Sequence, residues 1–205
     1  MKNPFLIGEK IYLRAVERED AAIFLPWVND FDVQRHMLLH RPMSLVAEEA
    51  WIARIQEDKS NVVLSIVLRK DDRVIGNTAL HGIHSHSHNA SFGIMIGDKD
   101  EWGKGYGSEA ARLIVGHGFR TLNLHRIWLH VYEDNERAIR SYEKVGFRRE
   151  GVLRDHVFRG GRYGNVIPMG ILRHEWANET RAPDDRHASV TKGRPVRRAS
   201  KQRAR

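Results

Sequence analysis

The chain has 205 residues, enough for one domain with a hydrophobic core, and it contains no cysteine. The lack of cysteine excludes disulfides, thiolate metal sites and catalysis by a cysteine nucleophile. No apolar run approaches the roughly 18 residues of a membrane helix, and the first residues lack a signal-peptide pattern. We therefore expect a cytoplasmic protein that makes no contact with a membrane.

The positive charge is concentrated at the C-terminal end. Residues 179–205 hold nine Lys or Arg and three Asp or Glu, which is +6 of the total net charge of +8. This segment has almost no large apolar residue, so its composition predicts disorder. We expect one domain over residues 1–178 and a basic tail over residues 179–205. Such a tail favours nonspecific contact with nucleic acid.

The spacing of apolar residues predicts elements in the order β-α-α-β-β-β-α-β-α-β-β. Asp20, Ser44 and Ser108 are expected to cap helices at their N-termini, and Gly146 is expected to close one at its C-terminus. This order indicates an α/β (α+β) domain with a mixed, largely antiparallel sheet flanked by helices. The expected strands are 11–14, 62–68, 74–80, 92–96, 126–132, 149–158 and 165–172, and the expected helices are 21–28, one after Ser44, one after Ser108 and 135–145.

A glycine-rich segment, Gly103-Lys104-Gly105-Tyr106-Gly107-Ser108, lies between a predicted strand and a predicted helix. Alternate glycines allow backbone N–H groups to converge at a helix N-terminus, which favours an anion. The spacing matches neither a Rossmann fingerprint nor a P-loop. On the glycines alone, a turn that serves only the bend between strand and helix remains an equal alternative.

Three segments together, 92–97, 102–110 and 135–147, strongly resemble the GNAT superfamily of acetyltransferases. The resemblance extends over about residues 11–176. It is closest to the branch with ribosomal-protein N-terminal, spermidine and amino-sugar acetyltransferases. The superfamily motif is Gln/Arg-x-x-Gly-x-Gly/Ala, and here Trp102 stands at its first position while Gly105 and Gly107 match. The resemblance implies an enzyme that moves an acetyl group from acetyl-CoA directly to a primary amine.

The resemblance also implies which residues hold acetyl-CoA. Residues 94–96 would offer backbone groups to the pantetheine arm, and residues 102–108 would hold the pyrophosphate. Because Trp102 replaces a polar side chain, phosphate binding would rely on backbone N–H groups, Lys104 and Ser108. The expected cofactor-binding residues are Ile94, Met95, Ile96, Trp102, Gly103, Lys104, Gly105, Tyr106, Gly107, Ser108 and Asn135.

Tyr142 matches the tyrosine that the resemblance implies as the general acid for the departing thiolate. A phenol with a pKa near 10 is protonated at neutral pH, whereas a thiol has a pKa near 8.5. Alone, Tyr142 reads as a core aromatic residue of an amphipathic helix. Asn135 lies two turns earlier on the same face, which favours a functional role, although it is also a good N-cap.

The sequence gives weaker indications for the residues that bind and activate the acceptor amine than for those that bind acetyl-CoA. Glu150 is the first candidate for the general base, since some relatives carry an acid at the matching position, and an exposed strand glutamate is an equal alternative. Glu17, Asp30 and Glu133 are further candidates. Trp27 and Asp30 lie between the first two helices, a region that lines the acceptor pocket in this family, so we expect them to bind substrate.

Four histidines, His81, His84, His86 and His88, occur between two predicted strands. Alternation at 84, 86 and 88 would place three imidazoles on one strand face, enough in principle for zinc. A polar hairpin loop explains the same pattern, so we expect no metal. A base role for one of these histidines is favoured over a metal site.

The lead hypothesis for the acceptor is a protein N-terminal amine, and the alternative is a small-molecule amine such as a polyamine or an amino sugar. A nucleic-acid or ribosome-binding protein that uses the basic tail is a less favoured reading, because it leaves Asn135 and Tyr142 without a purpose. A protein with this fold that binds acetyl-CoA without transferring the acetyl group is also a less favoured hypothesis. A homodimer is the default expectation.

Overall fold

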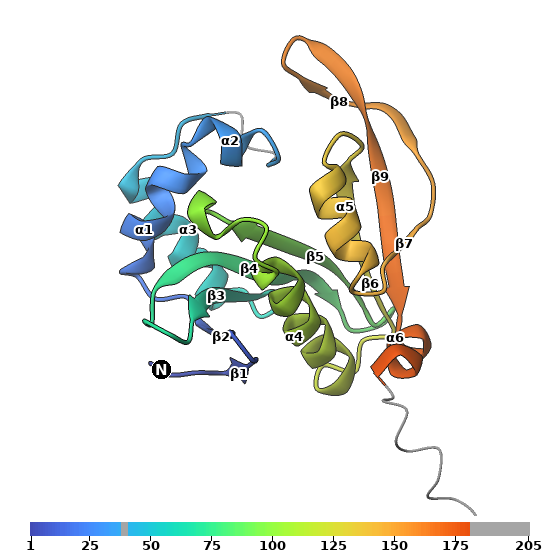
Figure 1. The fold of residues 1–205 in the computed structure, drawn as a ribbon, viewed down its shortest axis with the longest axis horizontal. Coiled ribbons are helices and arrows are strands. Elements are labelled where there is room, and N and C mark those ends of the chain that lie inside the picture. Colours follow the sequence, from blue (N-terminus) through green and yellow to red (C-terminus); the bar gives the residue numbers. More distant parts are fainter. Residues whose placement is uncertain (38–40, 181–205) are drawn as a thin grey trace, which may run out of the picture.

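The computed structural model of the chain describes residues 1–37 and 41–180 (Figure 1). The predicted basic tail therefore lies outside the described residues, apart from the end of the last helix. The strands are β1 (Leu6–Ile7), β2 (Ile11–Ala15), β3 (Val62–Leu68), β4 (Val74–His84), β5 (Asn89–Ile96), β6 (Arg126–Tyr132), β7 (Arg148–Arg149), β8 (Leu153–Arg159) and β9 (Arg162–Leu172). The helices are α1 (Asp20–Val28), α2 (Phe31–Gln34), α3 (Leu45–Glu57), the 3-10 helix η1 (Lys99–Glu101), α4 (Tyr106–Arg120), α5 (Glu136–Glu143) and α6 (Arg173–Thr180).

The strands form one sheet in the order β1-β2-β3-β4-β5-β6-β9-β7, with β8 paired to β9. All neighbouring pairs are antiparallel except β5 and β6, which run parallel. The predicted mixed and largely antiparallel sheet is confirmed. Figure 1 shows β8 and β9 as a long hairpin that extends beyond α5.

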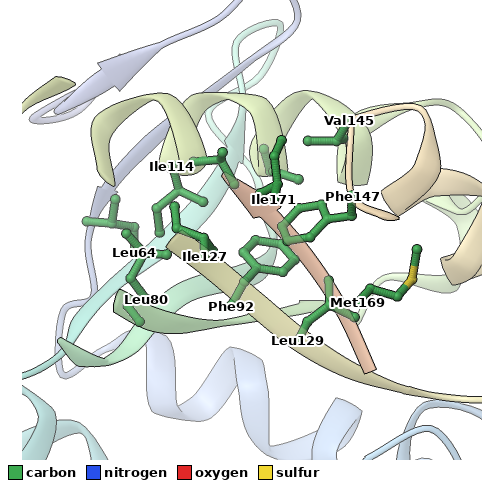
Figure 2. Close-up of a cluster of buried hydrophobic side chains, with 14 of the residues drawn as sticks. Leu64, Leu80, Phe92, Ile114, Ile127, Leu129, Val145, Phe147, Met169 and Ile171 are labelled. Atoms are coloured by element: carbon green, nitrogen blue, oxygen red, sulfur yellow. The ribbon is translucent and has the colours of Figure 1, made fainter. Parts of the chain in front are cut away.

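Helices cover both faces of the sheet, and strand alternation decides which side chains each face receives. In β2, Ile11 and Leu13 pack in the cluster that includes Ile114 of α4, whereas Tyr12 packs in the cluster that includes Phe24 of α1. Successive side chains of a strand point to opposite faces of the sheet, so neighbouring residues of β2 enter different clusters. Figure 2 shows the first cluster, in which side chains of the strands meet Ile114 and residues around the end of α5. The cluster includes Leu64, Leu80, Phe92, Ile127, Leu129, Val145, Phe147, Met169 and Ile171.

β5 and β6 diverge, and this divergence positions the candidate site. Their parallel pairing covers only three residue pairs, from Asn89 with Arg126 to Ser91 with Trp128. Beyond Ser91, β5 stays paired with β4, while β6 stays paired with β9 along its whole length. Within the part of the chain that the structure describes, residues 92–96 therefore pair with no strand on the β6 side.

The capping predictions were right at some helix ends and wrong at others. Ser44 accepts the N–H of Ala47 and caps α3, and Asn135 accepts the N–H of Ala138 and caps α5. Gly146, with φ of 106°, closes α5, since the Phe147 N–H bonds the Tyr142 carbonyl. Asp20 and Ser108 are not caps, because both lie inside their helices.

Asp20 has another structural role. Its buried carboxylate accepts two hydrogen bonds from the Arg14 guanidinium, both 2.7 Å long, and one from the Ser65 hydroxyl at 2.7 Å. These partners hold the pKa of Asp20 below its ordinary value, although burial acts in the opposite direction as the largest single influence. Asp20 therefore joins α1 to β2 and β3 from inside the fold.

Candidate active site

The glycine-rich segment forms the turn into α4. Gly103 and Gly105 have φ of 78° and 89°, conformations that favour glycine, and Gly105 stands at the N-cap position of α4. Its missing side chain provides no cap, so the first-turn N–H groups of residues 106–108 are left for another acceptor. With the helix dipole, they make this end of the 15-residue helix electrostatically favourable for an anion.

Trp102 fixes this turn against the end of β5. Its indole N–H donates to the Ile96 carbonyl at 2.7 Å, and the Arg137 guanidinium stacks over its ring at 3.9 Å. Ser108 does not cap α4. Its hydroxyl hydrogen-bonds the Ser141 hydroxyl at 2.7 Å and connects α4 to α5.

A cavity of about 310 Å³, here called the loop cavity, lies beside this turn. Ten of the eleven predicted cofactor-binding residues line it, and Lys104 is the exception. The Lys104 ammonium lies 2.8 Å from the Glu101 carboxylate, which also binds Arg73. Lys104 is therefore held by the buried Glu101 and does not line the cavity.

Three basic residues of the loop cavity were missed in the sequence analysis. Arg137, Arg140 and Lys144 all line it from α5 or its C-terminal end. Their spacing of three and four residues places them along one helix face, a signal that was available in the sequence. Burial lowers the pKa of Arg137, with the nearby charge of Arg35 acting in the same direction. An anion at this place would relieve that cost.

A second cavity of about 510 Å³, here called the histidine cavity, is lined by His36, His81, His130 and His156 together with side chains of α3, β3, β4, β5, β6, β8 and β9. It shares residues with the loop cavity, among them Ile94, Asn135 and Tyr142. The two cavities therefore adjoin where β5 and β6 diverge. A group bound in one of them can reach a group bound in the other.

Tyr142 lines both cavities. Its ring makes edge contacts with Phe92 and Phe147, with ring centroids 5.8 Å and 6.1 Å away. Burial raises the pKa of Tyr142 to about 12, and the charge of Arg137 opposes that shift. The hydroxyl is therefore protonated at neutral pH. Asn135 also lines both cavities while it caps α5.

His81 is held in a defined tautomer. The Asn61 side-chain oxygen accepts the Gly82 N–H at 3.2 Å and also lies 3.0 Å from His81 Nδ1. Because that oxygen accepts, Nδ1 carries the proton and Nε2 keeps its lone pair. Nε2 lies on the side of Gly93, another residue of the histidine cavity. Burial lowers the pKa of His81, so the ring is neutral at pH 7.

The remaining histidines of the sequence cluster form a hairpin turn. β4 ends at His84 and β5 begins at Asn89, and the His84 and His86 rings are 6.4 Å apart. Within residues 1–37 and 41–180, no group of three or more His, Cys, Asp or Glu side chains is arranged to hold a metal ion. The same residues include no helix long and apolar enough to cross a membrane.

Glu150 does not line either cavity. Its carboxylate pairs with the Arg126 guanidinium through two contacts of 2.5 Å, and this pairing lowers the pKa of Glu150. A carboxylate with a lowered pKa that already binds an arginine is a poor base. The geometry therefore argues against the predicted base role of Glu150.

Trp27 and Asp30 also lie outside both cavities. The Trp27 ring packs on Gly97, where a Cβ would come within 2.1 Å of it. Asp30 caps α2 and lies 2.7 Å from the Lys99 ammonium. The segment between α1 and α3 still contributes to the site, through His36 and Met37. Of the other proposed bases, Glu133 accepts a hydrogen bond from Asn165, and neither it nor Glu17 lines these two cavities.

The fold and the site together indicate the class of protein. β5 and β6 diverge, and a glycine turn with an uncapped helix N-terminus lies beside them. Residues 10–148 match the family model described as Acetyltransferase (GNAT) domain, and the chain belongs to this family. GNAT acetyltransferases use acetyl-CoA as co-substrate, so the chain is an acetyl-CoA-dependent N-acetyltransferase.

Named relatives are similar over most of their length. The chain is 32% identical to the spermidine N(1)-acetyltransferase of Escherichia coli (strain K12), over 86% of this chain and 93% of that protein. It is 31% identical to an uncharacterized N-acetyltransferase, p20, of Bacillus licheniformis, over 84% and 98%. A solved spermidine N-acetyltransferase from Vibrio cholerae, in complex with CoA and spermine, superposes with a TM-score of 0.78 at 28% identity, over 83% of this chain and 100% of that chain.

Proposed function

We propose that this enzyme transfers the acetyl group of acetyl-CoA directly to the primary amine of a small cationic molecule. The observation that carries the proposal is the meeting of the loop cavity and the histidine cavity at Asn135 and Tyr142. A cavity of about 510 Å³ has the size of a small-molecule site. The similarity to spermidine acetyltransferases favours a small-molecule amine over the protein N-terminal amine that led the sequence-based hypotheses.

The loop cavity fits the CoA part of the co-substrate. The N–H groups of residues 106–108 and the cations of Arg137, Arg140 and Lys144 suit its phosphates. The free edge of β5 at residues 94–96 suits the amides of the pantetheine arm, which would add to it as a strand does. Acetyl-CoA supplies an acetyl group activated as a thioester.

His81 is the proposed general base. The nitrogen of the amine forms a bond to the acetyl carbon, the carbon–sulfur bond breaks, and the amine must lose one proton. His81 Nε2 has a free lone pair because Asn61 holds the proton on Nδ1. A neutral imidazole in the wall of the cavity can therefore accept the proton of the amine.

Tyr142 is the proposed general acid. It lines both cavities at their junction, and its hydroxyl is protonated because burial raises its pKa to about 12. The hydroxyl donates a hydrogen bond to the sulfur as negative charge develops there and then supplies the proton that makes the free thiol. Asn135 holds the start of α5, which carries Tyr142.

Arg137→Ala is expected to weaken CoA binding by about tenfold or more, because it removes a cation that lines the loop cavity and stacks on Trp102. Lys104→Ala is expected to change the affinity less than about twofold, because Glu101 already holds that ammonium. Isothermal titration with CoA measures both variants. An equal loss in the two variants would contradict this division of roles.

A panel of acceptors tests the small-molecule assignment. The full chain is incubated with acetyl-CoA and with spermidine, 1,4-diaminobutane, glucosamine or a peptide with a free N-terminus, and the released thiol is measured. We expect kcat/KM for at least one small cationic amine to exceed the value for the peptide by about 10²-fold, because the histidine cavity has the size of a small-molecule site. Higher kcat/KM for the peptide would return the protein N-terminus to first place.

A further inference from the structure

His36 carries a buried ring nitrogen that the proposed mechanism does not use. The residue follows α2, and its side chain lines both the loop cavity and the histidine cavity. His36 Nδ1 is buried, and no residue in the described part of the chain forms a hydrogen bond with it. A buried polar atom without a partner is costly to the fold, so its presence needs an explanation. A ligand bound where the two cavities meet supplies one.

The other ring nitrogen determines whether Nδ1 carries a proton. The Arg35 Nε–H donates to His36 Nε2 at 3.2 Å, so Nε2 is the nitrogen with the lone pair. Burial lowers the pKa of His36, the charges of Arg35 and Arg159 act in the same direction, and Asp134 opposes them. The ring is therefore neutral at neutral pH, with its proton on Nδ1. His36 presents a buried N–H donor that lacks an acceptor.

The fold holds the backbone around His36 in place. The His36 N–H donates to a carbonyl of α2 at 3.2 Å. The Arg159 guanidinium of β8 donates to the Arg35 carbonyl. The Tyr132 hydroxyl of β6 donates to the Met37 carbonyl at 3.4 Å. The donor therefore belongs to a segment that is connected to the sheet on either side of it in sequence, which suits a group that must be in position before a reaction begins.

Acetyl-CoA brings a hydrogen-bond acceptor to this place. In the proposed function the thioester lies where the two cavities meet, beside Tyr142, and its carbonyl oxygen can accept from an N–H group. A protonated amine has donors only, so a cationic acceptor substrate cannot satisfy Nδ1–H. The carbonyl oxygen gains negative charge when the amine attacks, and a donor already in place stabilises that charge. The Arg35 guanidinium on Nε2 polarises the ring and strengthens the donor.

We propose that His36 Nδ1–H donates a hydrogen bond to the carbonyl oxygen of the acetyl group and stabilises the negative charge that forms there. The inference rests on the proposed function and adds a catalytic residue to it. The amine nitrogen bonds to the acetyl carbon, and the carbonyl π electrons move to the oxygen. When the carbonyl re-forms, the carbon–sulfur bond breaks and the thiolate leaves. His36 keeps its proton throughout, while His81 takes the proton of the amine and Tyr142 supplies that of the thiol.

Three variants and a spectroscopic probe test this proposal. His36→Leu removes the donor, and His36→Asn keeps one, because the Asn amide nitrogen is as many bonds from the backbone as Nδ1 is. His86→Leu makes the apolar change at an exposed histidine of the β4–β5 turn and is the control. Each full chain is saturated with acetyl-CoA carrying ¹³C at the carbonyl, and isotope-edited infrared spectra give the stretching frequency of the bound thioester carbonyl. Turnover, CoA affinity and thermal unfolding are measured in parallel.

A hydrogen bond lowers the carbonyl frequency, so we expect a shift to lower frequency in wild type and His86→Leu that is smaller in His36→Leu. His36→Leu should also lose about 10²-fold in kcat, with CoA affinity within about twofold and a thermal midpoint no lower than that of wild type. His36→Asn should recover part of both the shift and the rate.

An identical carbonyl frequency in wild type and His36→Leu would overturn the proposal, whatever happened to kcat. Loss of CoA affinity without a change in that frequency would overturn it too, since the donor would then bind the pantetheine arm. A His36-dependent shift in a wild type that transfers acetyl to no amine would instead contradict the proposed function and leave the contact with the carbonyl standing.

Discussion

Tyr142→Phe is expected to lower kcat by about 10²-fold or more while the affinity for CoA stays within about twofold. The substitution removes only the hydroxyl, so the ring contacts with Phe92 and Phe147 remain. The hydroxyl acts mainly when negative charge forms on sulfur, which is why the loss falls on kcat. Steady-state thiol release and calorimetric CoA binding measure the two quantities separately.

Tyr163→Phe is the matched control for this variant, because Tyr163 is 66% exposed and lies on the β8–β9 hairpin. We expect wild-type kcat for it. If Tyr142→Phe also turned over at the wild-type rate, Tyr142 would have no role as an acid. Its ring would then serve only to pack between the two cavities.

His81→Gln is expected to lower kcat/KM by about 10²-fold or more and to change its pH dependence. A base acts only when deprotonated, and burial places the pKa of His81 below its ordinary value of about 6.5. Wild-type kcat/KM should therefore stay independent of this group at neutral pH and fall only as pH drops through that lowered pKa. The variant should lack this acidic limb. Rates measured between about pH 5 and pH 8 test the prediction.

Two further variants separate a base role from a structural one. Asn61→Ala removes the acceptor that holds the proton on Nδ1, so it should reduce kcat/KM less than His81→Gln does. His86→Gln changes an exposed residue of the β4–β5 turn and should leave the profile unchanged. If His81→Gln kept the acidic limb of wild type, the limb would belong to another group and His81 would not be the base.

The loop cavity could be predicted from the sequence because its residues come from short contiguous segments. Gly103 and Gly105 lie in the predicted turn before a helix N-terminus, and the helical period places Asn135 and Tyr142 on one side of α5. Lys104 was predicted as a ligand because it stands inside the motif. Its ion pair with Glu101, a residue buried by the surrounding fold, could not be read from the spacing.

The histidine cavity could not be predicted in this way. His81 is one of the four clustered histidines among which the sequence favoured a base, but their spacing did not single it out. The fold places His81 in one cavity wall with His36, His130 and His156, which lie far from it in the sequence. Tertiary contact also explains why the geometry argues against Glu150 as a base, because its carboxylate pairs with Arg126 of β6. Residues of the acceptor side are brought together by tertiary contacts, and the local sequence pattern does not predict these contacts.

Short and weakly amphipathic elements account for most of the missed fold. β1 has two residues and α2 has four, too few to show a period. The predicted strand over 149–158 is divided into β7 and β8. β4 and β5 are longer than predicted, because their pairing continues to His84 with Asn89 through a polar stretch. By contrast β3 and β6, both rich in alternating or β-branched apolar residues, begin and end as predicted.

The most direct test of direct acetyl transfer is to quantify the N-acetylated amine and the free CoA thiol in the same reaction. The full chain is incubated with acetyl-CoA and 1,4-diaminobutane or spermidine, and the products and the protein are analysed by mass spectrometry. Direct transfer predicts equal amounts of N-acetylamine and CoA, with no acetylated form of the protein required for turnover. Thiol release without N-acetylamine, or the obligatory appearance of an acetyl-enzyme, would contradict the account.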